Sequence, residues 1–181
     1  MENLHLFTDR LELRSVEVSD LSNIHRLLSI AEVDEYNALG IPTNTEVTEV
    51  YLNEWIDNFR YRKEFVFAIR LKSTEIFIGL ISLIVGNPKY KIGSLWYKLD
   101  PQFWSKGYAT EAVGEVLKFS FQTMELHRVE AGCAIANIGS VKVLEKSGLI
   151  REGHKREILP LKSGWSDTYE YGILEKDWVT R

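Results

Sequence analysis

The chain has 181 residues, of which 45% are hydrophobic, and its 22 Lys and Arg against 26 Asp and Glu give a formal net charge of -4. This length suits one domain around one core, expected to span residues 1–181, and the acidic balance argues against a dedicated nucleic-acid-binding surface. The longest apolar run, around Ile76–Val85, is well short of the ~20 residues of a membrane helix, and the amino terminus lacks a charged-then-apolar signal pattern, so a cytoplasmic protein without a membrane partner is expected.

The amino-terminal third of the chain predicts a strand and two helices joined by a loop. Arg10–Arg14 alternates apolar and charged residues, as does a strand with one face on a core. Apolar residues at helical spacing predict a helix over 21–31, after the capping pair Ser19-Asp20, and another over 47–59. Residues 32–45 lose this periodicity around a glycine and a proline, so a loop that lines a substrate site is expected there.

The middle of the chain predicts three strands in a meander. Phe65–Leu71 and Ile76–Val85 are rich in β-branched and aromatic residues and are separated by a short polar turn, which indicates a hairpin. A third run, Ile92–Leu99, ends at Asp100-Pro101, where proline blocks further ladder pairing. This third strand leads directly into a glycine-containing loop.

The carboxyl-terminal part predicts a crossover unit and a final pair of strands. Apolar residues recur at helical spacing over Gly107–Met124, and a strand at Arg128–Ile135 follows. The order strand, glycine loop, helix, strand gives two parallel strands with the loop at their carboxyl ends. A helix over Ile138–Lys146 and strands near Ile150–Leu159 and Trp165–Leu174 complete a mixed α/β sheet flanked by helices.

The loop after the meander, Trp104–Thr110, has the features of an anion site. Backbone N–H groups at a helix amino terminus bind a pyrophosphate without a dedicated side chain, because they converge on it and the helix dipole favours its charge. Gly107 permits a close approach, Lys106 adds a cation, and Ala109 and Thr110 are small enough for the first turn to close on a ligand. The alternative is that Gly107 only relieves a tight strand-to-helix turn.

The segment Trp104-Ser105-Lys106-Gly107-Tyr108-Ala109-Thr110 resembles the acyl-CoA loop of the GNAT superfamily of N-acetyltransferases, whose pattern is Gln/Arg-x-x-Gly-x-Gly/Ala. Gly107 and Ala109 match this pattern. Trp104 departs from it, but tryptophan at this position resembles the RimJ/RimL-like branch of ribosomal-protein N-terminal acetyltransferases. Three further segments resemble that branch, so the resemblance spans nearly the whole chain: Thr8–Arg14, His127–Ala131, and Asn137–Ser140 leading to Leu144–Gly153.

The resemblance implies the GNAT fold, a mixed, mostly antiparallel sheet of about seven strands flanked by helices, with a splayed parallel pair at strands four and five. It implies that the pantetheine arm of acetyl-CoA pairs with the backbone of strand four, that the asparagine of Asn-x-x-Ser contacts this arm, and that the serine lies near the sulfur. Only the backbone of strand four is assigned, because aromatic side chains on a sheet usually bury area first. The residues assigned to acetyl-CoA are Leu95, Trp96, Tyr97, Trp104, Ser105, Lys106, Gly107, Tyr108, Ala109, Thr110, Asn137 and Ser140.

Acetyl transfer to an amine needs a proton donor and a proton acceptor. Many superfamily members carry a tyrosine seven residues after the asparagine, where this chain has Leu144, so Ser140 is the predicted donor to the CoA thiolate. The alternative for Ser140 is a first-turn helix serine. A free amine is largely protonated near neutral pH, so a base or a water chain accepts its proton, and Glu35 and Glu157 are the candidate bases.

The remaining reactive side chains are not assigned to chemistry. Cys133, the only cysteine, excludes an intramolecular disulfide and lies in an apolar strand, so an inert buried thiol is expected. Glu130 and Glu152 resemble framework residues of the family. No metal is expected, because four histidines are scattered without metal-ligand spacing: His5, His25, His127 and His154.

The expected function is transfer of an acetyl group from acetyl-CoA to a primary amine by direct attack in a ternary complex. A protein N-terminal α-amine is the leading acceptor. A small amine, such as an antibiotic, a polyamine or an amino acid, is one alternative, and a non-catalytic acyl-CoA sensor is another. A homodimer through the last strands or through exposed aromatics such as Trp165 and Trp178 stays open.

Overall fold

An eight-stranded sheet in the order β1-β2-β3-β4-β5-β6-β8-β7 forms the centre of the computed structural model, which describes residues 4–179. The strands are β1 His5–Phe7, β2 Leu11–Ser15, β3 Glu64–Leu71, β4 Phe77–Val85, β5 Ile92–Leu99, β6 Arg128–Ala134, β7 Ile150–Leu161 and β8 Gly164–Leu174. The helices are α1 Leu21–Leu28, α2 Ala31–Asp34, α3 Thr45–Arg60, α4 Tyr108–Lys118, α5 Ile138–Lys146 and α6 Glu175–Val179, with short 3-10 turns at Val18–Asp20 and Pro101–Phe103.

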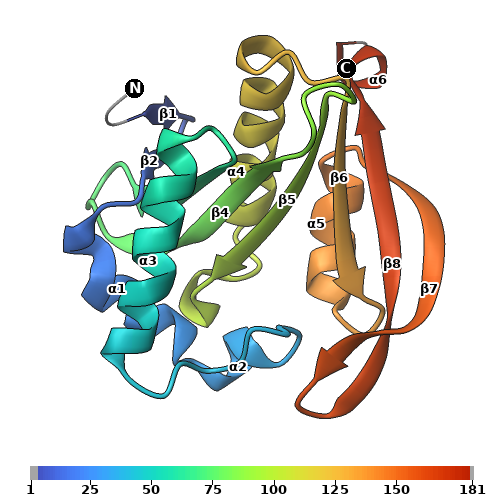
Figure 1. The fold of residues 1–181 in the computed structure, drawn as a ribbon. Coiled ribbons are helices and arrows are strands. Elements are labelled where there is room, and N and C mark those ends of the chain that lie inside the picture. The colour runs from blue at the N-terminus through green and yellow to red at the C-terminus, as the bar shows by residue number, and fades with distance from the viewer. Residues whose placement is uncertain (1–3, 180–181) are drawn as a thin grey trace.

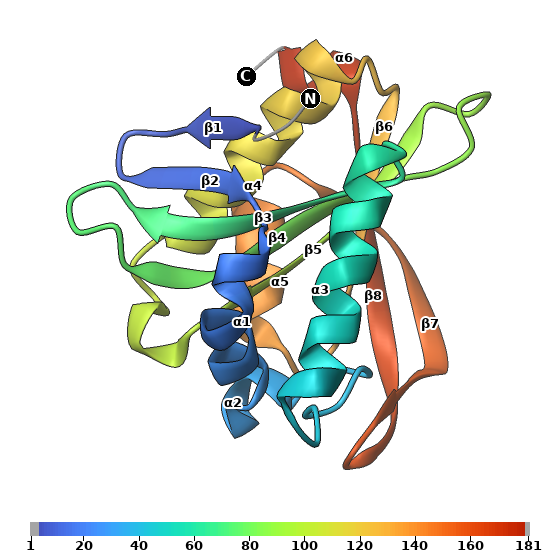
Figure 2. The same ribbon diagram turned by 60° about the vertical axis from the view of Figure 1, so that its left-hand side comes forward.

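Helices cover both faces of the central strands, so the sheet separates two apolar clusters (Figures 1 and 2). On one face Phe65 and Phe67 of β3 meet Phe119 at the end of α4, with ring centroids 5.3 and 6.0 Å apart in edge-to-face geometry. On the other face Val66 and Ala68 pack beneath α1 and α3. This alternation explains why the middle strands are nearly continuous hydrophobic runs.

The only parallel pair of this sheet, β5 and β6, separates soon after it begins. Its register contains three residue pairs, from Ile92 with Arg128 to Ser94 with Glu130. Beyond these pairs β5 continues to Leu99 alongside β4, and β6 continues to Ala134 alongside β8, but the two strands no longer pair with each other. Figure 1 shows them diverging. The predicted splayed pair, strands four and five of the expected order, is therefore β5 and β6.

The structure confirms the mixed sheet and adds one strand to the expected seven. β1, the added strand, has three residues and pairs with β2, and so short a segment shows no readable alternation. The helix expected to reach Met124 leaves α-helical geometry after Lys118 and continues as a π-helix over Phe119–Thr123, in which the Met124 N–H bonds to the Phe119 carbonyl. The short helix α2 occupies the start of the expected 32–45 loop. No helix within residues 4–179 has the length and apolar character needed to cross a membrane.

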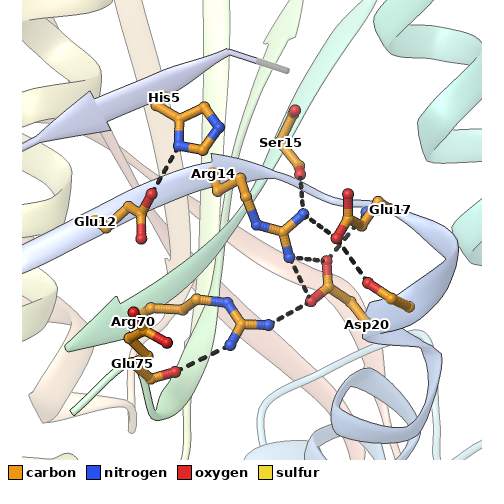
Figure 3. A network of polar contacts seen from close by, with 9 residues as sticks. His5, Glu12, Arg14, Ser15, Glu17, Asp20, Arg70 and Glu75 are labelled. Atoms are coloured by element: carbon orange, nitrogen blue, oxygen red, sulfur yellow. Dashed lines mark hydrogen bonds and ion pairs between the residues drawn. The ribbon is translucent and has the colours of Figure 1, made fainter. Parts of the chain in front are cut away.

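A buried ion network fixes the start of α1 to the sheet (Figure 3). Asp20 is fully buried, and its Oδ1 lies 2.8 Å from Nη2 of Arg14 on β2 and 2.7 Å from Nη2 of Arg70 on β3. Glu17 adds a second carboxylate 2.8 Å from Arg14 Nη1. Removing one partner of such a buried network costs about 3–5 kcal/mol, because the remaining charges stay desolvated. The network thereby holds the start of α1 against β2 and β3.

Candidate active site

The loop Trp104–Gly107 turns the chain sharply from the end of β5 into α4. The indole Nε1 of Trp104 donates to the Leu99 carbonyl at 2.8 Å, which ties the loop to the strand that it leaves. Ser105 and Gly107 have φ angles of 59° and 83°, in the left-handed region that favours glycine. Gly107 is the N-cap of α4 and has no side chain to bond to the first turn. The amide groups at this helix end are therefore left for an anion beside the carboxyl end of β5.

An ion-pair clamp joins this loop to the turn between β1 and β2. Glu111 of α4 accepts hydrogen bonds from Thr8 Oγ1 at 2.5 Å, Arg10 N at 2.9 Å and Arg10 Nε at 2.6 Å. Arg10 also donates to the Lys106 carbonyl at 3.1 Å and lies over the Tyr108 ring, 4.5 Å from its centroid. Partial burial alone would raise the pKa of Glu111, but the hydrogen bonds from Thr8 and Arg10 outweigh it and lower that pKa. The clamp gives a physical reason for two motifs that lie far apart in sequence to occur together.

On the α4–α5 face of the slot, the hydroxyl groups of Tyr97 and Ser140 are in contact. Their oxygens are 2.7 Å apart, and the Asn137 Oδ1 accepts from the Ser140 amide at 3.0 Å as the N-cap of α5. Burial raises the pKa of the Tyr97 phenol well above its ordinary value, by more than the hydrogen bond to Ser140 lowers it. Tyr97 therefore stays protonated at neutral pH and holds the Ser140 hydroxyl in place. From the sequence only the Tyr97 backbone was assigned to the site, and this side chain was missed.

The wall behind this pair holds neutral groups. Cys133 is 7% exposed, and burial raises the pKa of its thiol to about 11. Burial also raises the pKa of Tyr171 to about 12, and its hydroxyl donates to Glu145 at 3.3 Å. A thiol that stays protonated is a poor nucleophile, so Cys133 does not fit a covalent mechanism.

The opposite face of β5 carries Trp96 and Lys98, because side chains alternate along a strand. The Trp96 ring packs against Trp55 of α3 with centroids 5.7 Å apart, and its Nε1 donates to Glu64 at 3.0 Å. Burial lowers the pKa of Lys98 to about 8, although the nearby Asp34 carboxylate of α2 acts in the other direction. The two faces of β5 thus differ in chemistry, with hydroxyls on one and an indole, a carboxylate and an amine on the other.

The two predicted bases lie apart from the Tyr97–Ser140 pair. Glu35 is exposed at the end of α2, where its hydrogen bond raises the pKa of Tyr36. Glu157 is exposed on the edge strand β7 with φ at 48°, and its amide donates to Asp167 at 2.9 Å. The structure therefore does not bring either carboxylate into the hydroxyl cluster.

Other residues singled out from the sequence have structural partners. Arg128 bonds to Glu130 at 2.7 Å and to Glu152 at 2.9 Å, as suits framework residues. Trp165 is 67% exposed, but the expectation that Trp178 is exposed was wrong, since it is partly buried and its ring lies tilted against Phe121, with centroids 5.6 Å apart. Within the described part of the chain, no three His, Cys, Asp or Glu side chains are grouped to hold a metal ion.

Comparisons with known proteins identify the family of this chain. The model of the acetyltransferase (GNAT) domain family matches residues 10–150. The N-acetyltransferase YnaD of Bacillus subtilis is 32% identical over 97% of this chain and 99% of its own length. The spermidine N(1)-acetyltransferase of Vibrio cholerae is 27% identical over 95% of this chain and 97% of its own.

Solved structures show the same fold. A GNAT-family acetyltransferase from Bacillus anthracis superimposes with a TM-score of 0.85 at 30% identity, over 96% of this chain and 99% of the other. Spermidine N-acetyltransferase from Vibrio cholerae, in complex with CoA and spermine, gives 0.85 at 24% identity over 95% and 99%. Ribosomal-protein-S5-alanine acetyltransferase from Vibrio fischeri gives 0.84 at 21% identity over 97% and 98%. The family match, the YnaD relationship and the splayed β5–β6 pair together show that this chain belongs to the GNAT family and is an acetyl-CoA-dependent N-acetyltransferase.

Proposed function

We propose that the enzyme binds acetyl-CoA in the slot between β5 and β6 and acetylates a primary amine, with Ser140 and Tyr97 supplying the proton to the departing thiolate. One observation carries this proposal. The stretch of β5 beyond Ser94, which has no partner on β6, opens beside the Tyr97–Ser140 hydroxyl pair and leads to the amino terminus of α4. The groups proposed for cofactor binding and for proton donation therefore lie together near the carboxyl end of β5.

Two parts of the proposed site suit two parts of acetyl-CoA, its pyrophosphate and its pantetheine arm. The amides of the first turn of α4, within the loop Trp104–Thr110, suit the pyrophosphate, because no side chain caps them. Beyond Ser94 the β6-facing edge of β5 has no partner strand, so the backbone of Leu95–Tyr97 is free to pair with the amide-bearing pantetheine arm. Holding the thioester and the amine together in this way supplies about 7–11 kcal/mol toward the barrier.

The Tyr97–Ser140 pair has a definite chemical task. As the amine attacks the thioester carbonyl, negative charge passes to the sulfur, and a hydroxyl within hydrogen-bonding distance stabilises or protonates it. Ser140 donates to the thiolate, and the protonated phenol of Tyr97 restores the serine proton through their 2.7 Å contact. Tyr97 thereby supplies the phenol that many superfamily members carry at the position of Leu144. Such an intact donor pair argues against a non-catalytic acyl-CoA sensor.

Two acceptor classes follow from two separate observations. Trp104 and the accompanying motifs favour a protein N-terminal α-amine, through the RimJ/RimL-like resemblance. The relative named a spermidine N(1)-acetyltransferase favours a small polyamine. Both are primary amines, and the same slot chemistry serves both.

A turnover assay tests the proposal. Release of free CoA thiol is followed with a panel of polyamines, amino acids and peptides with free amino termini, and mass spectrometry identifies the acetylated product. Gly107→Asp places a carboxylate against the pyrophosphate and is expected to abolish CoA binding, whereas Ser140→Ala is expected to lower turnover more than CoA affinity. Retained CoA binding in Gly107→Asp would refute the loop assignment, and a wild-type enzyme that binds CoA but acetylates no amine would refute the function.

A further inference from the structure

Glu64, the first residue of β3, is a buried carboxylate on the sheet face that carries α1 and α3. It is 9% exposed, and its Oε1 accepts from Ser82 Oγ at 2.7 Å and from Trp96 Nε1 at 3.0 Å. Both donors bond to the same oxygen, so Oε2 keeps its capacity to accept another hydrogen bond. Among the ion pairs of residues 4–179, none includes Glu64. A buried carboxylate without a cation gains strongly from one that arrives with a ligand.

The strand register places Glu64 in the row of residues at which the slot begins, two strands away from β5. Glu64 lies opposite Ile84, Ile84 opposite Ser94, and Ser94 opposite Glu130, in the last row before β5 and β6 separate. Trp96, whose indole bonds to Glu64, is the next residue on the same face of β5 and belongs to the unpaired stretch. The carboxylate is therefore joined through Trp96 to the start of the slot, on the face opposite the Tyr97–Ser140 pair.

The helix layer ends beside this carboxylate. On this face Val66 of β3 and Leu80 of β4 are covered, with exposures of 1% and 0%. Ile84 of β4 is 41% exposed, and Ser94 of β5 is also exposed. The row that contains Glu64 is thus exposed at β4 and β5, beside the buried carboxylate, where α1 and α3 do not cover it.

We propose that Glu64 receives the acceptor amine: its carboxylate binds the ammonium group of an alkylamine and then takes a proton from it. Trp96, which bonds to Glu64, begins a row of three rings, with Trp96 and Trp55 centroids 5.7 Å apart and Trp55 and Tyr51 centroids 6.5 Å apart. Aromatic faces attract an ammonium ion and pack against an alkyl stem. They offer little to the amide groups that follow a peptide α-amine, so the structure favours an alkylammonium acceptor. This inference rests on the acetyl transfer proposed above and names its acceptor.

The proton balance is complete without another reagent. R–NH3+ gives one proton to Glu64 Oε2 and becomes R–NH2, whose lone pair forms the C–N bond at the thioester carbon. The C–S bond breaks with its electron pair on sulfur, and the nitrogen loses a second proton to solvent. The thiolate gains a proton from Ser140, Tyr97 restores the serine proton, and solvent restores the proton of Tyr97. Glu64 returns its proton to solvent, so the sum is one amide, one CoA thiol and one released proton.

The variant Glu64→Gln tests this assignment, because it keeps the shape and the acceptor oxygen for Ser82 and Trp96 but removes the charge. We expect its CoA affinity and its circular dichroism spectrum to match the wild type, and its kcat/KM for butylamine to fall about 100-fold. Glu64→Asp, which keeps the charge, is expected to recover part of this loss. The matched control is Glu54→Gln on α3, where an exposed carboxylate undergoes the same change.

Calorimetry gives a readout that does not depend on turnover. Butylamine is titrated into each CoA-saturated protein, with 1-butanol as the uncharged probe of the same stem. We expect Glu64→Gln to weaken butylamine binding at least tenfold, about 1.4 kcal/mol, and to leave the butanol signal unchanged.

The outcomes separate the two proposals. Equal butylamine binding and equal kcat/KM in wild type and Glu64→Gln would overturn the Glu64 assignment while acetyl transfer stands. Charge-dependent binding at Glu64 without acetylated product from any amine would support the amine site and refute the proposed function. Acetylation of peptides alone, without butylamine binding to the wild type, would overturn the alkylammonium class.

Discussion

Replacing Tyr97 with Phe removes one oxygen from the slot and leaves the ring in place. Loss of the 2.7 Å hydroxyl contact costs about 1 kcal/mol of folding stability, so the variant stays folded. The chemical loss is larger. A positioned proton donor contributes about 10²–10⁴-fold, and a thiolate whose acid has a pKa near ~8.5 is a tolerable leaving group, so we expect the low end, about 100-fold in kcat. Ser140→Ala breaks the same chain and is expected to lose about as much.

The double variant tests whether the two hydroxyls act as one device. If they form a single relay, Tyr97→Phe with Ser140→Ala loses about 100-fold, not the roughly 10⁴-fold of two independent donors. Single-turnover rates with saturating acetyl-CoA measure the chemical step, and calorimetry checks that CoA affinity changes less than about threefold. The relay would be refuted if the rate losses of the two single variants multiplied in the double variant, or if the variants lost only CoA affinity.

Three further perturbations have signs fixed by the structure. Gly107→Ala forces a side chain into the left-handed region, so we expect a loss of about 1–2 kcal/mol in urea unfolding together with weaker CoA binding; unchanged stability would contradict the cap geometry. Glu111→Gln is expected to cost about 1–2 kcal/mol at neutral pH because the clamp is partly exposed. Since the folded pKa of Glu111 is lowered, this difference is full above the unfolded pKa and is lost as pH falls through the folded one, and a gap that persists in acid would contradict it. Burial destabilises the charged form of Lys98 and lowers its pKa from 10.5 to about 8. Between these pH values the unfolded chain binds more protons than the folded one, so wild-type stability rises with pH across that window. Lys98→Met should therefore be more stable than wild type near pH 7, by at most about 3 kcal/mol, with the advantage shrinking toward pH 10.5 in thermal unfolding.

Hydrophobic patterning predicted the strands and the long helices, because most elements are long enough to show their period. The helix α5 was predicted over Ile138–Lys146, as found. The strand β1 was missed because three residues carry no period, and the π-helix after Lys118 was missed because apolar spacing continues through it to Met124. Short segments and local changes of helix type depend on packing that the pattern alone does not contain.

In the candidate site, too, local features could be predicted from the sequence and long-range contacts could not. The loop Trp104–Thr110 was predicted from a local motif, since a glycine at a strand-to-helix turn is visible in sequence. The Tyr97–Ser140 contact joins residues 43 positions apart, and the Glu64–Trp96 contact joins residues 32 apart. Such contacts follow from sheet register and from where α5 lies, so no local pattern marks them. Strand alternation did contain a usable signal, because it places Tyr97 and Trp96 on opposite faces.

This opposition makes a final prediction about the two proton transfers. On the two proposals above, Glu64 binds the amine from the α1–α3 side and Ser140 serves the sulfur from the α4–α5 side, because their contacts with Trp96 and Tyr97 lie on opposite faces of β5. Groups that share no partner act on the barrier independently, so the free-energy effects of Glu64→Gln and Ser140→Ala should add. If each single variant loses about 100-fold in kcat/KM, the double variant should lose about 10⁴-fold, in contrast to the Tyr97–Ser140 pair. Matched measurements with saturating acetyl-CoA and limiting butylamine would show it. A double variant no worse than either single one would mean that both residues serve one proton path, and that β5 does not separate an amine side from a thiolate side.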